Sequence, residues 1–479
     1  MIRLKNRQKQ LFLGWLGLYL WVLPLYSIRT TNLSHEDPIP LYTVKENRYL
    51  LDKKLNFYKD DDFADYKSKR DFFSFSIAPF GVAADRARNY QGIKPQLYIA
   101  TTQNLPNEPS EEVPLGDVHG RTALIPLVYG PEPVGQSLPQ VLLVAKDALF
   151  GGYIDQNGEV DEAKFIDQNE EFGYLSVNFK YRKKGVRFGW TLRFAEDFGL
   201  RFATSVASLK KSMYNEIKYT DAAARGDLQS ADVTKYLYDQ TLSILDALGK
   251  TYVDEMPRVS IEDLKASIFW RRIFELNIDQ ESVWNPLLLI PYLECIASVA
   301  PGAATRPEYM FDGMFGNNQH ASIGFVSGIY LDFIDTVYVS GEVGFTHFFK
   351  RDVKNMAIPN SPYQQNLYPF STDVSVHPGG NWHFALKMGS DYFFDAFSMY
   401  VEYVMMEHKQ DTITLKEPDF AFLPNILEAK TAFKSKVINA GLTYAISPNI
   451  EFGFVWQIPV TQRGAYKSTT VMFSFDAAL

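Results

Sequence analysis

The chain is poor in cysteine and lacks the common catalytic motifs. Its 479 residues include one cysteine, Cys295, which excludes an internal disulfide and a metal centre made of several thiolates. The patterns HExxH and GxSxG and the glycine-rich phosphate-binding loop are also missing. We therefore predict neither an enzyme activity nor a cofactor, and we expect Cys295 to pack as a small hydrophobic residue.

Histidine is scarce as well, with seven residues in the chain. Only His320 and His347 come near each other in the expected strand order, across one hairpin. Their positions in the alternating pattern place them on opposite faces of the sheet, whereas a metal ion needs its ligands on one side. We expect no metal site.

Overall hydrophobicity is low for a membrane protein. The mean hydropathy is only −0.17, although 15% of the residues are aromatic. A bundle of membrane helices would be far more apolar, whereas a membrane-spanning β-barrel hides its signal in the alternation of its strands.

The N-terminus has the layout of a secretory signal peptide. Four basic residues between positions 3 and 9 precede the apolar run 11–26, and Ser27 is a small residue at the expected cleavage point. An uncleaved anchor is the alternative, because Leu25 is larger than the residue usual at that position. Loss of residues 1–27 removes four basic residues and no acidic one, so the net charge goes from −8 to −12. An exported acidic chain is not expected to bind nucleic acid.

Strand-like alternation is strongest between residues 172 and 208. Three segments there alternate between apolar and polar residues, which is the period of a β-strand. Val186, Phe188 and Trp190 share one face of the middle segment, and the run 182–185 separates it from the segment before it. The opposite, polar faces of the three segments carry Lys180, Arg187, Arg193 and Arg201.

The same alternation returns from residue 321 to the C-terminus. Turns at 332–335, 395–396 and 447–449 interleave with long loops at 351–381 and 409–435. We predict an all-β chain with a helical insert at 231–248, in which residues 72–475 form an antiparallel transmembrane β-barrel of about 12–14 strands. The upper number includes Phe72–Phe80 and Val141–Ala145. Residues 28–71 are a polar N-terminal segment, and residues 476–479 form a C-terminal tail.

On these residues the chain resembles Gram-negative outer-membrane β-barrel proteins of the broad porin-like type. The resemblance covers residues 172–475 and extends to Phe72. Such proteins usually end on an aromatic residue of the last strand; Phe473 and Phe475 match this in part, since the chain continues to Leu479. The resemblance implies an outer-membrane location, contact with lipid and no catalytic residues, and it is compatible with a homo-oligomer.

The polar faces predict the function. Lining a lumen, they indicate a porin-like channel for passive diffusion of small polar or ionic solutes. In the alternative, these charges pair across a closed interior and the barrel is a non-conducting structural or adhesive surface protein. A third interpretation is a carrier for hydrophobic ligands, in which the helix 231–248 belongs to a hatch and Leu287–Ile296 contacts the ligand. The expected pore-lining residues are Lys180, Arg187, Arg193, Arg201, Glu342, Lys387, Asp391, Glu402 and Glu451.

Overall fold

The structure is a computed structural model. The chain divides into two compact units, residues 1–30 and 31–479, and all described residues belong to the second. The expected signal peptide and polar N-terminal segment lie outside the described residues. Those residues are 73–89, 112–118, 122–151, 174–194, 197–213, 218–220, 236–237, 239–251, 256–276, 287–306, 309, 311–333, 337–362, 364, 366–394, 396–447 and 450–478.

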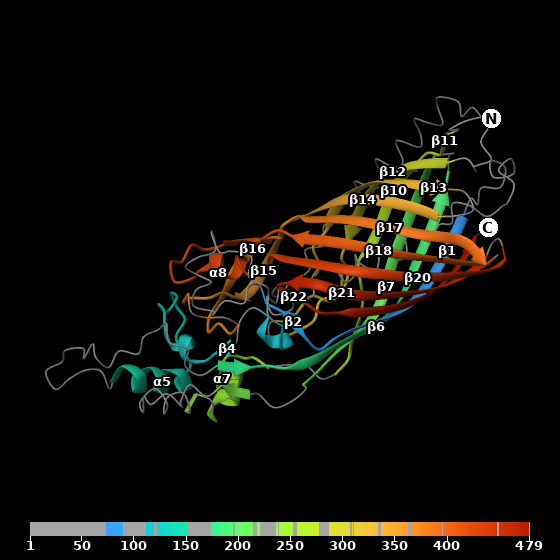
Figure 1. The fold of residues 1–479 in the computed structure, drawn as a ribbon. Helices are drawn as coiled ribbons and strands as arrows, with labels where there is room; N and C mark the ends of the chain where they lie inside the picture. The colour runs from blue at the N-terminus through green and yellow to red at the C-terminus, as the bar shows by residue number, and fades with distance from the viewer. Residues whose placement is uncertain are drawn as a thin grey trace. The chain divides into compact units, whose positions relative to one another are not determined.

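Twelve antiparallel strands form a closed barrel (Figure 1). The last strand pairs with the first, and β7 pairs with β10, so the sheet has no free edge along the main ring. Two short strands, β9 (Arg258–Ile261) and β11 (Phe274–Leu276), extend the ring beside β7 and β12. In ring order the twelve strands are β1 (Phe73–Ala84), β6 (Phe179–Arg193), β7 (Phe198–Met213), β10 (Leu264–Arg271), β12 (Leu287–Val299), β13 (Ser322–Phe333), β14 (Val337–Phe348), β17 (Asn381–Phe394), β18 (Phe397–His408), β20 (Phe433–Ser447), β21 (Ile450–Arg463) and β23 (Thr469–Ala478).

The strands separate two environments by their alternation. On β13, Phe325 and Ile329 are 57% and 51% exposed, whereas Val326 between them is 5% exposed. Large apolar side chains are exposed in the same way on the outer faces of the other long strands. A continuous exposed apolar surface of this kind is what lipid covers in a membrane-spanning barrel.

Connections at the two ends of the barrel differ in length. At the end where β1 begins and β23 finishes, here called the turn end, short turns join β6 to β7, β13 to β14, β17 to β18 and β20 to β21. Most connections at the opposite loop end are long, the one from β21 to β23 being an exception; at the turn end the connection from β10 to β12 is longer than the others. This confirms the expected arrangement of short turns and long loops.

The long loops are folded into a cap with small sheets of its own. One sheet combines β15 (Arg351–Ala357), β16 (Ser371–His377) and β19 (Thr412–Leu415), next to helix α8 (Pro424–Glu428). Its apolar side chains belong to one buried cluster with Leu115 and Leu127 from the loop after β1. The remaining elements are β2 (Ala87–Arg88), β3 (Glu112–Val113), η1 (Leu115–Asp117), β4 (Thr122–Ala123), η2 (Ile125–Val128), α5 (Gln140–Gly151), β5 (Tyr174–Ser176), β8 (Lys218–Thr220), α7 (Thr241–Ala247) and β22 (Ala465–Tyr466).

Side-chain amides tie the loops of the cap together. Gln364 donates to the Pro126 carbonyl at 3.1 Å, Asn366 donates to the Gly116 carbonyl at 3.1 Å, and Asn360 donates to the Pro131 carbonyl at 2.9 Å. These contacts join residues more than two hundred positions apart in the sequence, so the cap brings together loops from distant parts of the chain.

Several sequence expectations need correction. Residues 141–145 lie in helix α5 and not in a strand; a five-residue apolar run fits either state, and Pro139 directly before the helix supplies the carbonyl that accepts its first backbone hydrogen bonds. The helix expected at 231–248 is α7, which is shorter, and residues 231–235 lie outside the described residues. Strand β23 continues to Ala478, so residues 476–478 are strand and not a tail. Among the described residues, no helix is long and apolar enough to cross a membrane.

The lipid-facing side of β18 provides a test of the fold. Val401 is 51% exposed on that side, so we expect Val401→Arg to weaken folding into a bilayer by about 2–4 kcal/mol, the cost of arginine near the bilayer midplane. The folded fraction in lipid vesicles across a urea series, read by heat-modifiable migration on a gel, measures this. Val401→Leu should behave as the wild type. An arginine variant of unchanged stability would contradict the placement of β18 against lipid.

Candidate solute pathway inside the barrel

The structure places most of the predicted pore-lining residues on the inner face. Arg187 and Arg201 point inward from β6 and β7, and Arg193, half-buried, shares the inner face of β6. The acidic residues Glu342, Glu402 and Glu451 and the basic residue Lys387 are all at least 93% buried on the inner faces of β14, β18, β21 and β17. The side chain of Asp391 lies outside the described part of the chain.

Lys180 is on the wrong face for a pore-lining residue. The sequence pattern treats 182–185 as a separation between two strand segments, across which the inward face can change. In the structure β6 is one strand from Phe179 to Arg193 with no break in register. Phe179 and Tyr181 therefore share the inner face with Arg187, and both are buried. Lys180 shares the outer face with Arg182 and Lys184, which are exposed near the loop end.

Because β6 is continuous, Lys183 faces inward, which the sequence pattern did not identify. Lys183 is 2% exposed and forms an ion pair with Glu262, which is 0% exposed. The Ser205 hydroxyl donates a hydrogen bond to the same carboxylate. Arg187 lies over the ring of Phe80 at 4.2 Å from its centroid and also acts electrostatically on Glu262. A single buried carboxylate thus lies among cations of the β6 wall.

A second set of paired groups lies on β7, β12, β14 and β17. Arg201 binds Glu294 at 3.1 Å, and His383 Nε2 lies 3.3 Å from Glu342. The hydroxyl of Tyr292, on β12, donates a hydrogen bond to Glu342 on β14, across the intervening strand β13. This tyrosine was not among the predicted residues, because its polar tip is hidden in an apolar run.

A polar ladder continues through β17, β18, β20 and β21. Lys387 lies 4.1 Å from the ring centroid of Tyr400, and its cross-strand neighbour is Glu402. Glu402 accepts a hydrogen bond from Asn439 at 2.9 Å, and Asn439 accepts one from Gln457 at 3.0 Å. Glu402, Asn439 and Gln457 are each 0% exposed. In this structure the ladder is packed against other side chains and not against water.

The loop between β12 and β13 packs against the inner wall near the loop end. Phe311 and Phe315 of this loop are at most 1% exposed, and the Phe311 ring lies 5.4 Å from that of Phe179. Lys211 on the inner face of β7 donates to the Asp312 carbonyl oxygen at 2.9 Å. The carboxylate of Asp312 pairs with Arg258 and, at 3.2 Å, with Arg306. We call residues 300–321 the closing loop.

Chemically, the described part of the interior offers fixed charges of both signs. Charges taken out of water are costly unless they are paired and hydrogen-bonded, and the pairs above meet that need. No group of three or more metal-ligating side chains occurs within the described part of the chain. The arrangement can orient a polar or ionic solute, provided that side chains or the closing loop move to admit it.

Removal of the buried carboxylate should destabilise the barrel. We expect Glu262→Gln to lower the free energy of unfolding by about 3–5 kcal/mol, because Lys183 is then left buried without its counter-charge. Glu112→Gln is the matched control: it breaks the partly exposed pair Lys467–Glu112, 3.0 Å apart, which is worth about 0–1 kcal/mol. Denaturant titration of the two variants measures both values, and equal effects would show that Glu262 is not effectively buried.

The closing loop should be sensitive to acid through His320. This side chain is 1% exposed beside the loop end, where its Nδ1 lies 3.0 Å from the Phe349 carbonyl oxygen. Burial, aided by the nearby charge of Arg351, lowers the pKa of His320 to about 4 from its ordinary value of 6.5. The unfolded chain therefore takes up a proton at a higher pH than the folded chain.

The stability that neutral His320 contributes is complete above about pH 6.5 and is lost as the pH falls toward 4. We expect the thermal midpoint to drop between pH 7 and pH 4.5, and to drop less in His320→Gln. Thermal melts of both proteins at the two pH values measure the difference. The same drop in both would mean that other groups cause the acid sensitivity.

Comparisons with known proteins leave the function open. No family model and no curated protein matches the chain. Among solved structures it is similar to an outer-membrane channel from Pseudomonas putida F1 (TM-score 0.44, 7% identity, 88% of this chain and 100% of that chain). It is also similar to the translocator domain of the autotransporter NalP from Neisseria meningitidis (0.33, 7%, 92% and 96%) and to the toluene transporter TodX from Pseudomonas putida (0.29, 7%, 88% and 92%).

At identities of 7% and TM-scores below 0.5, these likenesses do not assign a function to this chain. The fold is decided by the chain's own strand order and by its two faces. The protein has the fold of an outer-membrane β-barrel, with twelve antiparallel strands, an apolar outside and a polar inside.

Proposed function

We propose that the protein is an outer-membrane channel for small polar or ionic solutes and that the barrel interior is its pathway. One observation carries the proposal: charges of both signs line the inside of a closed barrel whose outside is apolar. A barrel that served only as an anchor could fill its interior with apolar side chains at lower cost, because each buried charge has to be compensated.

Apart from Lys387 on β17, the inward pore-lining residues of the two signs lie on different parts of the ring. Arg187, Arg193 and Arg201 come from β6 and β7, whereas Glu342, Glu402 and Glu451 come from β14, β18 and β21. Opposed basic and acidic walls orient a dipolar or ionic solute as it passes. Exposure of the solute to both walls favours small hydrophilic molecules over apolar ones.

The channel that we propose is gated. The inner-face charges are buried, and Phe311 and Phe315 of the closing loop pack against β6 residues near the loop end. Passage therefore needs a displacement of the closing loop, which makes specific contacts with the wall. The contacts that hold the loop include the hydrogen bonds from Lys211, the ion pair of Arg258 with Asp312 and the hydrogen bond from Asn317 N–H to the Asp263 carboxylate.

The same burial favours a second candidate function. A barrel whose interior charges stay paired conducts nothing and acts through its outer surfaces, and the folded cap offers a rigid surface for adhesion or attachment. Delivery to the outer membrane, which both functions need, fits the signal peptide that we propose for residues 1–27.

Ion conductance in a planar bilayer separates the two candidates. We expect the purified wild type to open rarely and Phe311→Ala/Phe315→Ala to open more often, since the double variant loosens the closing loop. In that background, Arg193→Ser/Arg201→Ser should reduce the preference of the open channel for anions over cations, because the variant removes two cations from the inner wall. The matched control is Arg182→Ser, which removes a cation from the outer face of the same β6 strand.

Each variant must first show heat-modifiable migration, so that a misfolded barrel is not counted as a silent one. Conductance that stays absent at every voltage in both the wild type and the loop variant would overturn the channel and leave the surface protein. An equal loss of anion preference in Arg182→Ser would show that the inner wall does not set selectivity.

A further inference from the structure

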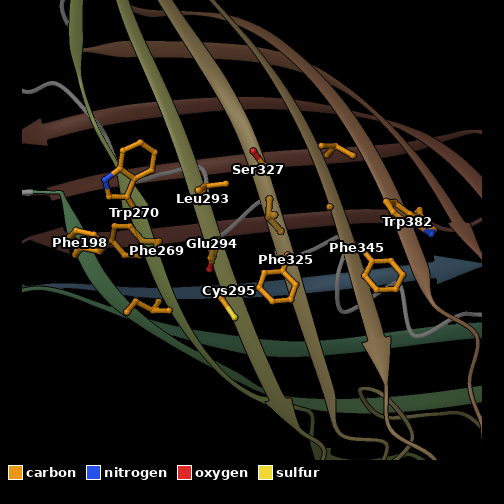
Figure 2. Close-up of a pocket in the computed structure, with 14 residues that line it drawn as sticks. Phe198, Phe269, Trp270, Leu293, Glu294, Cys295, Phe325, Ser327, Phe345 and Trp382 are labelled. Atoms are coloured by element: carbon orange, nitrogen blue, oxygen red, sulfur yellow. The ribbon is translucent and has the colours of Figure 1, made fainter. Parts of the chain in front are cut away.

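The outer wall of the barrel contains a groove that the proposed solute pathway does not use. It has a volume of about 470 Å³ and lies across β7, β10, β12, β13, β14 and β17 (Figure 2). That volume falls within the range of about 300–1,000 Å³ found for small-molecule sites. The lining residues that matter here are Phe198, Trp270, Leu293, Cys295, Ser327, Phe345 and Trp382.

The groove arises from a difference in side-chain size along the wall. Cys295 and Ser327 are small outward residues on the neighbouring strands β12 and β13, and they leave a low floor. Phe345 and Trp382 rise on one side, with ring centroids 4.7 Å apart. Phe198 and Trp270, which face each other across β7 and β10, rise on the other side. Figure 2 shows these aromatic residues on both sides of the β12 strand.

The lining carries no outward charge. Glu294 belongs to the lining, but its carboxylate binds Arg201 at 3.1 Å and is 92% buried on the inner face of β12. The hydroxyl of Ser327 and the thiol of Cys295 are the outward polar atoms of the floor. Such a surface recognises an occupant by its shape and not by its charge.

The position of the groove determines what can occupy it. It is continuous with the exposed apolar surface formed by Ile329, Val339 and Leu386, each at least 40% exposed. In a membrane this surface is covered by lipid, so the molecules that reach the groove are those dissolved in the hydrocarbon. The flexible apolar chains that are abundant there are the acyl chains of the membrane lipids.

We propose that the groove holds one acyl chain of a membrane phospholipid in a fixed place on the barrel wall. An acyl chain gains no hydrophobic free energy on moving from bulk lipid to this groove, because both surroundings are apolar. The gain comes from van der Waals contact with the rigid aromatic walls, which bulk lipid cannot provide. The site is separate from the proposed conduction, since its aromatic walls and the side chains of Cys295 and Ser327 face away from the interior.

Photocrosslinking of the full-length protein in lipid vesicles tests this proposal. The probe is a phosphatidylethanolamine with a diazirine in its acyl chain, present as a minor component, and mass spectrometry locates the adducts. We expect roughly a threefold to tenfold excess of adducts on Leu293, Cys295 and Phe345 over Val401 and Leu442, because packing alone provides the preference. Those two reference residues are exposed on the lipid-facing side of β18 and β20 without lining the groove.

Variants that fill the floor provide the matched comparison. Cys295→Leu/Ser327→Leu should reduce the excess to the level of the reference residues, whereas Val401→Leu should leave it unchanged. Both variants keep the inner pair of Arg201 with Glu294, so channel measurements on them show whether the groove and the pathway are independent. Folding of each variant is checked by heat-modifiable migration.

Three results would overturn the proposal. These are equal labelling of the groove and the reference residues, an excess that survives the floor-filling variant, and an excess that appears only with a diazirine-labelled free fatty acid. The last result would indicate a site for free fatty acids, which is a different kind of ligand.

Discussion

Backbone hydrogen bonding is the constraint on which the rest of this structure depends. Hydrocarbon offers no partner for an N–H or C=O group, so strands that cross it must pair with one another on both sides. The ring closes where β23 meets β1 and where β7 meets β10. In the closed ring, successive side chains point alternately outward and inward. The same period of two therefore decides which residues contact lipid and which fill the interior.

Closure also explains why charged side chains on the inner face form ion pairs. A 12-strand ring encloses a narrow interior, which side chains can fill. Charges that line such a space are removed from water, and an unpaired one would cost several kcal/mol. The combinations Lys183 with Glu262 and Arg201 with Glu294 meet this cost locally. The pathway that we propose would therefore consist of groups that exchange partners, since a polar solute is itself a suitable partner.

Much of the barrel could be predicted from the sequence, because alternation is a local property. The barrel strands β13, β14, β17, β18, β20, β21 and β23, their short turns and the inward position of Glu342, Lys387, Glu402 and Glu451 follow from it. Prediction failed where the pattern has two explanations. The basic run 182–185 looks like a turn, but it is part of β6 near the loop end, where charged residues can point outward into the solvent. For this reason the sequence pattern assigned Lys180 to the inner face and did not identify Lys183 as an inward residue.

Other features could not be read from a local pattern at all. The cap joins residues far apart in the sequence, such as Asn366 and Gly116, and a periodic pattern contains no information on such contacts. The strand β12 shows the opposite problem, since its apolar run 287–297 hides the alternation expected of a strand. The run contains Pro291, and the partner strand is interrupted between β10 and β11 beside that proline, which fits the missing N–H of proline.

The composition of β12 follows from its place between the groove and the interior. Leu293 and Cys295 line the outer groove, while Glu294 between them pairs with Arg201 on the inner side. Because neighbouring residues point to opposite sides, one short stretch contributes to two surfaces that never touch the same molecule. A substitution at Cys295 and one at Glu294 are adjacent in sequence but should act on different properties, lipid contact in the first case and the charge balance of the interior in the second. Residue parity, and not distance along the chain, is therefore the physical basis for grouping mutations in this protein.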